Sequence, residues 1–179
     1  MGVLKCSEVI GLPVICTDDG KKIGVVEDLI FTPMKKEVKA LLLERTGYEI
    51  CKKVVLMKDI AYLGKDAVMV NSKSCKTEMR KAASNGALED KGEIRGLTVY
   101  SKSGEDLGEV KDVLFDCKTG VVEGVEVTGG LFQDIMQGRK ILPLFGKVEF
   151  SEESVLVDRE AVDEMVATGG GIKKKLLKE

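Results

Sequence analysis

The chain has 179 residues, of which 44% are apolar and 32% charged, and its net charge at pH 7 is −2. This composition is typical of a folded globular protein and excludes a chain that is disordered throughout. The near-neutral charge also excludes a global attraction to phosphate backbones or anionic lipid, so binding to either would need a local basic patch.

The N-terminal twenty residues lack the apolar run and the cleavage site of a signal peptide. No stretch of the chain approaches the roughly 20 apolar residues that cross a bilayer, and we expect a cytoplasmic protein. Aromatic residues make up only 4%, with no Trp. The core must therefore consist mainly of Val, Ile, Leu and Met, which favours β structure.

The first elements along the chain are two strands joined by a tight turn. A short strand at 14–17 ends at Asp19-Gly20, a dipeptide typical of hairpins, and the return strand is expected at 23–31. Gly24 lies inside the return strand, where glycine usually marks a bulge or a sharp bend. Further strands are predicted at 54–57 and 67–70.

The same series of residues returns later in the chain, which indicates a duplicated unit. Strands are accordingly expected at 99–102, 107–115, 121–127, 141–144 and 154–157. The identical pairs that align the copies are Gly11/Gly96, Leu12/Leu97, Val14/Val99, Gly20/Gly104, Gly24/Gly108, Val26/Val110, Asp28/Asp112, Phe31/Phe115 and Val38/Val122. We expect the shared Asp28 and Asp112 to hold a turn or backbone amides rather than to perform chemistry.

One turn differs between the two copies. Gly120 ends the turn 116–120 of the second copy, where a positive φ can close the hairpin, whereas the first copy has Lys36 at that place. Either Lys36 accepts a strain of about 1 kcal/mol or its turn takes another geometry. We expect the two loops to differ.

The fold predicted from these patterns is all-β, with two tandem small barrels, each closed so that no sheet edge is exposed. The units are expected at 1–72 and 91–167, joined by a linker at 73–90 in which 75–83 forms two helical turns that Asn85-Gly86 ends. A short helix over 159–167, capped by Asp158, is expected to close the second barrel, and 168–179 to form a flexible basic tail. Because duplicated domains often mimic a homodimer, we expect a pseudo-twofold axis between the units.

The pattern G-L-x-V-x(5)-G-x-x-[IL]-G-x-V-x-D-[LV]-x-F at 11–31, repeated one residue shorter at 96–115, resembles the motif of the PRC-barrel family. The segment 141–144 is similar to the strand that follows the variable loop of that family. Members of the PRC-barrel family include the H subunit of photosynthetic reaction centres, a bacterial ribosome-maturation factor and many small stand-alone proteins. The resemblance implies a β-barrel that serves as a docking module. It implies no catalytic residues, because the motif consists of turn glycines and core positions.

The residues that usually carry catalysis are scarce. The sequence has no His, which is the commonest general base at neutral pH and the commonest metal ligand. Its cysteines are never closer than ten residues, so there is no CxxC motif and we expect reduced thiols. No phosphate-binding GxxxxGK[ST] motif occurs. We therefore expect no enzymatic activity, no metal and no cofactor.

Two segments are candidates for contact with a partner. The loop 128–140 carries apolar residues at helical spacing, which either dock another protein or plug the barrel mouth. The C-terminal tail carries lysines after a Gly run, which either contact an anionic partner or form a solubilising end. The loop residues are Leu131, Phe132, Ile135 and Met136, and the tail residues are Lys173, Lys174, Lys175 and Lys178.

The leading functional hypothesis is a non-catalytic interaction or scaffold protein that binds another protein through its barrels. Homo-oligomerisation stays open, and no small-molecule substrate is expected. The first alternative is an accessory factor in RNA metabolism or ribosome assembly that contacts a ribosomal protein or RNA. The second alternative is a peripheral membrane-associated assembly protein.

Overall fold

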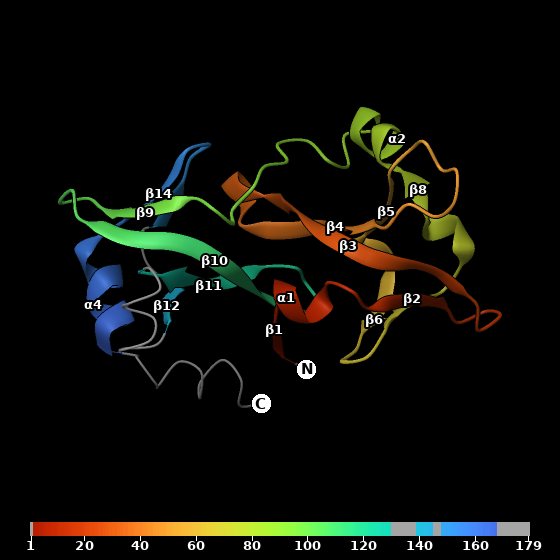
Figure 1. Ribbon diagram of the computed structural model, residues 1–179, viewed down its shortest axis with the longest axis horizontal. Coiled ribbons are helices and arrows are strands. Elements are labelled where there is room, and N and C mark those ends of the chain that lie inside the picture. The colour runs from red at the N-terminus through yellow and green to blue at the C-terminus, as the bar shows by residue number, and fades with distance from the viewer. Residues whose placement is uncertain (1, 130–138, 145–147, 168–179) are drawn as a thin grey trace.

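The computed structural model describes residues 2–129, 139–144 and 148–167. Two seven-stranded sheets lie side by side along the long axis of the molecule (Figure 1). The first sheet contains β2 (Pro13–Cys16), β3 (Lys22–Thr32), β4 (Glu37–Leu43), β5 (Lys53–Leu56), β6 (Ile60–Leu63), β7 (Val68–Val70) and β8 (Thr77–Glu78). The second contains β1 (Val3–Lys5), β9 (Thr98–Ser101), β10 (Asp106–Asp116), β11 (Val122–Thr128), β12 (Lys140–Pro143), β13 (Val148–Phe150) and β14 (Ser154–Val157).

Helical segments are short and lie between or after the strands. The α-helices are α1 (Cys6–Val9), α2 (Met79–Ser84) and α4 (Arg159–Ala167), and the 3-10 turns are η1 (Pro33–Lys35), η2 (Met57–Asp59) and η3 (Lys73–Cys75). The all-β prediction and the short C-terminal helix at 159–167 are both confirmed.

The internal repeat is confirmed by strand order and register. The first sheet runs β6-β7-β2-β3-β4-β5-β8, and the second, in the corresponding order, runs β13-β14-β9-β10-β11-β12. Each unit also has one parallel pair at the same place: Val14 of β2 faces Val68 of β7, and Val99 of β9 faces Val155 of β14. The two copies in the sequence therefore fold into the same unit twice.

The glycine inside each long strand lies where the strand pairing shifts. The ladder between β2 and β3 slips next to Gly24, and that between β9 and β10 slips next to Gly108. A shift of this kind bends a strand and increases its twist. The predicted bulges are confirmed, and they let each sheet curl around its core.

One apolar core runs through both units. Phe31 and Phe115 are fully buried in it, together with aliphatic residues from nearly every strand. Burial of each such side chain contributes about 1.5–3 kcal/mol to stability. A smaller cluster forms where Ala82 and Leu88 pack with Ala40 and Val54 of β4 and β5.

The segment 73–90 is more structured than a plain linker. Its helix lies at Met79–Ser84, within and just beyond the 75–83 expected, and Gly86 follows it with a φ of 75°. The sequence did not predict η3 or β8, which pairs with β5 through Lys53–Glu78 and Val54–Thr77.

From the sequence we expected strand pairing to close each barrel. The described residues do not form a continuous hydrogen-bonded ladder around either barrel. Among the described residues, no strand pairing joins β5 to β6 or β12 to β13. The β5–β6 connection is made by η2 instead, and α4 packs against β12 at the end of the second sheet (Figure 1). Side-chain packing and short helices thus cover sheet ends that strand pairing leaves open.

The two turns that were expected to differ share one feature. Lys36 adopts a left-handed conformation with φ 51°, like Gly120 with φ 76°, so the first copy accepts the strain. The hydrogen bonds do differ: the Lys36 amide bonds to the Pro33 carbonyl, three residues back, and the Gly120 amide to the Asp116 carbonyl, four back. The expected difference is therefore one of hydrogen bonding rather than of the final backbone conformation.

The segment that precedes the first repeated strand of each unit crosses to the other unit. β1 lies before β2 in the first unit but pairs with β10 of the second, with Leu4 facing Phe115. Gly92 lies before β9 in the second unit and forms a bridge to Phe31 of the first. This exchange was not predicted from the sequence, and through it each unit pairs with a segment of the other.

The centre of the joint has local twofold symmetry. The Val38 amide donates to the Gly120 carbonyl at 2.7 Å, and the Val122 amide donates to the Lys36 carbonyl at 2.8 Å. Lys36 corresponds to Gly120 and Val38 to Val122, so the two hydrogen bonds are exchanged by the repeat. The expected pseudo-twofold axis passes through this contact.

Candidate functional site

The residues predicted to contact a partner lie outside the described part of the chain. These are Leu131, Phe132, Ile135 and Met136 of the loop before β12, and Lys173, Lys174, Lys175 and Lys178 of the tail. Both assignments stay predictions. The corresponding loop of the first unit, 44–52 between β4 and β5, is described and carries apolar residues of its own.

Tyr48 and Ile50 project from the β4–β5 loop into solvent. Tyr48 is 104% exposed and Ile50 88% exposed, the two highest values among the exposed large apolar residues of the described chain. An exposed Tyr beside an exposed Ile offers a large contact area to another protein, because aromatic anchors contribute much of the energy of interfaces. The sequence carried a signal for this site, since Tyr and Ile are the apolar members of an otherwise polar loop, but the prediction considered only the loop of the second copy.

Polar contacts hold this loop in a defined turn. The backbone amide and hydroxyl of Thr46 donate to Glu49 Oε2 at 3.2 and 3.0 Å. Lys76 Nζ donates to Glu49 Oε1 at 3.4 Å and to the Ile23 carbonyl at 3.2 Å. The donors from Thr46, and then Lys76, lower the pKa of the Glu49 carboxyl. The loop therefore presents its apolar tip from a fixed base, which reduces the entropy lost on binding.

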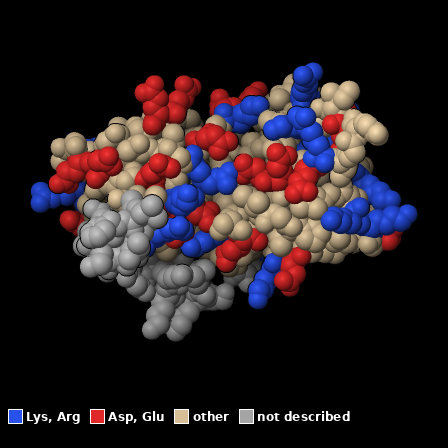
Figure 2. Space-filling view, viewed as in Figure 1, with Lys and Arg blue, Asp and Glu red and all other residues tan. Residues whose placement is uncertain are grey.

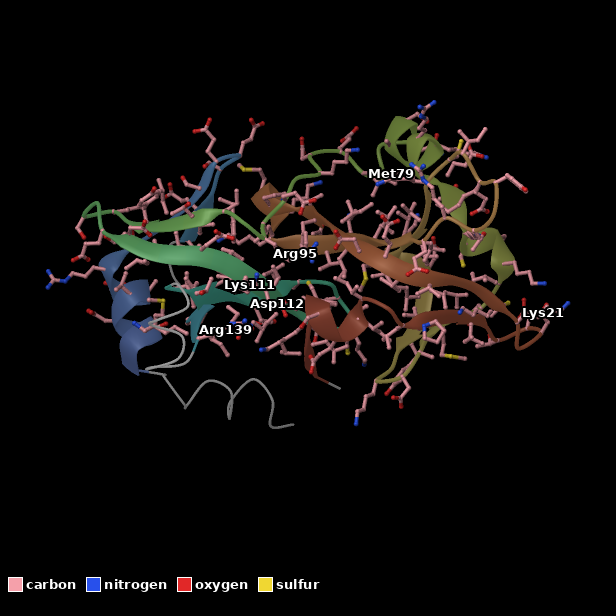
Figure 3. The ribbon with its side chains drawn as sticks, viewed as in Figure 1. Lys21, Met79, Arg95, Lys111, Asp112 and Arg139 are labelled. Atoms are coloured by element: carbon pink, nitrogen blue, oxygen red, sulfur yellow. The ribbon has the colours of Figure 1, made fainter. Side chains whose placement is uncertain are left out.

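The shared aspartates lie at the joint, where each one secures the crossing segment of the other unit. Asp112 Oδ1 accepts from the Ser7 amide at 3.4 Å, and its Oδ2 accepts from the Ser7 hydroxyl at 2.5 Å. Asp28 forms an ion pair with Arg95. Arg95 and Asp112 both lie near the centre of the molecule, where the sheets meet (Figure 3).

Both aspartates also accept a hydrogen bond from the next backbone amide. The distances are 2.7 Å from Leu29 to Asp28 and 2.8 Å from Val113 to Asp112. The expectation that these residues hold backbone amides is confirmed. What the sequence did not reveal is their second role, as clasps between the units.

Different charged and aromatic groups surround the two shared aspartates. The Arg95 guanidinium lies 5.9 Å from the centroid of the Phe31 ring, a cation–π distance. Burial, followed by the nearby Asp28, raises the pKa of the Glu93 carboxyl, whereas Arg95 opposes that shift. On the other side Lys5 Nζ bonds to Glu126 Oε2 at 2.8 Å and ties β1 to β11. Arg95 and Lys5 therefore each pair with a carboxylate across the joint.

Among the residues described, no three His, Cys, Asp or Glu side chains gather in a way that could hold a metal ion. Burial, followed by the charge of Asp112, raises the pKa of the Cys6 thiol far above its ordinary value. A thiol in that state is a poor nucleophile, because the thiolate is the reactive form.

Acidic and basic side chains are interspersed on the face of the molecule shown in Figure 2. On that face, the mixture of charges does not give the single-sign field that steers a protein to nucleic acid. In the described part of the chain, no helix is both long and apolar enough to cross a membrane.

The fold and the joint define the class of the protein: a tandem β-barrel module whose two units are clasped about a local twofold axis. The family model for the PRC-barrel domain matches the chain twice, at residues 1–74 and 90–163. The chain therefore belongs to the PRC-barrel family, as its motif indicated. A comparison with curated proteins finds no match.

Proposed function

We propose that this chain is a cytoplasmic, non-catalytic docking protein that binds another protein through the loops at the ends of its two barrels. The observation that carries the proposal is the exposed pair Tyr48 and Ile50 on a turn held by Glu49. Exposed apolar side chains on a preorganised turn favour binding, because little side-chain or loop freedom is lost. The PRC-barrel fold is compatible with a small binding module.

The proposal is tested by removing the apolar tip. Wild-type chain, a Tyr48→Ser/Ile50→Ser double variant and a Tyr62→Ser control are each used to capture partners from source-cell lysate in low and high salt. Tyr62 is a suitable control because it is also exposed, at 63%, but lies on β6 away from the loop. The captured protein is then purified and its affinity measured by calorimetry.

We expect the double variant to bind the purified partner at least tenfold more weakly, a loss of about 1.4 kcal/mol or more, because both anchors are truncated. The Tyr62→Ser control should bind within about twofold of wild type. Equal binding by the double variant and wild type would contradict the proposal.

A chain ending at Ala167 separates this function from the RNA or ribosome-assembly alternative. Docking through the loop predicts that the truncated chain retains its partner in high salt, because apolar contacts are weakly screened. If instead RNA or ribosomal proteins are captured, and are lost with the tail or with salt, the alternative is correct and the loop is not the main site.

A further inference from the structure

A second candidate site lies at the joint itself. A pocket of about 460 Å³ opens between β4, the β5–η2 corner, the segment after α2 and the β10–β11 turn of the second unit. This volume falls in the range of small-molecule sites, about 300–1,000 Å³. Because both units contribute to its walls, its shape depends on the two barrels being clasped together.

The walls of the pocket are basic. Lys39 and Lys58 reach it from the first unit and Lys118 from the second, whereas Glu37 is the one acidic residue that lines it among those described. Glu37 is already occupied, since its Oε1 lies 3.1 Å from Lys39 Nζ. Two lysines, Lys58 and Lys118, are thus left without a carboxylate on the pocket wall.

Asp116, the acidic residue of the β10–β11 turn, does not line the pocket, although its charge interacts with that of Lys118. Asp116 Oδ1 accepts from the Lys118 amide at 3.0 Å and from the Thr119 amide and hydroxyl at 2.8 and 2.9 Å. Lys58 makes no side-chain hydrogen bond or ion pair within the described residues, and neither does Lys118. Both side chains are exposed and able to turn toward a bound anion.

The floor of the pocket is apolar. It includes Val38, Leu56 and Met57, whose side chains are almost fully buried and present only a small surface to the opening. A flat or apolar group can pack on such a floor, while the lysines above it bind a charged group. A ligand with both features fits better than a bare anion.

The basic character belongs to this side of the joint alone. At the equivalent positions across the twofold axis, Lys39 is replaced by Glu123 and Lys118 by Met34. The duplicated sequence therefore does not account for the cluster of lysines. By contrast, the pocket of about 610 Å³ beside Met34 has a mainly acidic lining, with Asp90, Glu93 and Glu152 against the single base Lys91.

From this arrangement we infer that the joint binds a small molecule that carries a phosphate monoester on a flat, apolar body. The two lysines without a carboxylate match the charge of about −1.5 to −2 on such a phosphate better than the single charge of a carboxylate. Lysine binds phosphate as a point charge and requires no bidentate geometry. None of the residues that line the pocket belongs to the docking loop 44–52, so the two sites are separate.

The probe for this site is phenyl phosphate, titrated into the full-length chain by calorimetry. Inorganic phosphate tests the anionic half of the ligand and phenol the apolar half. We expect phenyl phosphate to bind with a Kd of about 1 mM or tighter, and more tightly than either half. Binding should weaken with added salt, because the lysines supply much of the attraction.

Two variants of equal charge localise the binding. Lys58→Gln/Lys118→Gln should weaken the binding of phenyl phosphate about tenfold. Lys65→Gln/Lys111→Gln removes the same net charge from exposed lysines outside the pocket and should change the binding less than about twofold. At the same ligand concentration, amide chemical shifts around the pocket should move less in the first variant than in wild type, while the dispersed spectrum of the ligand-free variant shows that it is folded.

The inference is wrong if phenyl phosphate does not bind, if inorganic phosphate binds as tightly, or if both double variants lose binding equally. The Tyr48→Ser/Ile50→Ser variant should bind phenyl phosphate like wild type. A failure of the docking proposal therefore leaves this result unchanged, and the two sites can be judged separately.

Discussion

The two units have the same strand order and nearly the same register, yet the backbone bends at equivalent positions are accommodated differently. Gly24 and Gly108 both lie where a long strand shifts its pairing, but only Gly108 has a positive φ, at 113°. Lys36 and Gly120 share a left-handed conformation, although only one of them is glycine. The comparison shows that the duplicated fold fixes the strand pairing, while each copy has its own way of accommodating the bends.

The largest expected effect concerns the two strand glycines. A Cβ at Gly108 would overlap the Thr128 carbonyl and would also strain a backbone in the left-handed region. We expect Gly108→Ala to lower the free energy of unfolding by about 3–4 kcal/mol. A Cβ at Gly24 would meet only the end of the Leu43 side chain, at 2.9 Å, so Gly24→Ala should cost about 1 kcal/mol.

Urea unfolding of the two alanine variants measures this difference directly. Equal losses would mean that the bulge itself, common to both units, sets the requirement for glycine. A much larger loss for Gly108→Ala would assign the requirement to the local backbone conformation of the second unit.

The next difference lies between the two clasps. Asp112 is buried, with 6% of the residue exposed, and its loss leaves the amides of Ser7 and Val113 without their acceptor. We expect Asp112→Ala to destabilise the chain by about 2–3 kcal/mol. The Asp28 side chain is 33% exposed, so water can replace part of its contacts and Asp28→Ala should cost about 1 kcal/mol.

Hydrogen exchange shows whether each loss arises at the joint. Exchange in β1 and α1 should become faster in the Asp112 variant, and exchange around Gly92 and Arg95 in the Asp28 variant. Faster exchange of the same segment in both variants would show that the crossing segments open together and that the clasps are not independent.

Much of the unit could be predicted because its signals are local. The hairpin dipeptide at Asp19-Gly20, the strand glycines and the apolar spacing of 159–167 each depend on neighbouring residues. The repeat strengthened this evidence, because the turn glycine and the strand glycine occur in both copies. The shared aspartates were also assigned correctly to backbone amides, since an Asp inside an apolar strand needs a nearby donor.

The joint was not predictable from the same signals. β1 has only three residues, Val3–Lys5, all of intermediate burial, so it shows no alternation that would mark a paired strand. Its partner β10 lies more than 100 residues away, and nothing near Leu4 in the sequence points to Phe115. The pocket at the joint depends on this long-range pairing, so its lysines appeared in the sequence only as scattered charges.

The smallest expected effect concerns the turn at Lys36. This residue has φ 51° and ψ 50°, which costs a non-glycine residue about 1 kcal/mol. Lys36→Gly should remove that cost, while the greater freedom of glycine in the unfolded chain offsets part of it, leaving a net stabilisation of about 0.5 kcal/mol. The hydrogen bond from Val122 to the Lys36 carbonyl is retained, because it uses only the backbone.

Lys35→Gly is the matched control, since Lys35 lies in η1 without a positive φ and its replacement should destabilise the chain. If Lys36→Gly destabilises as much as Lys35→Gly in urea unfolding, the lysine side chain stabilises the turn. Its contacts would then offset the strain of the positive φ at Lys36.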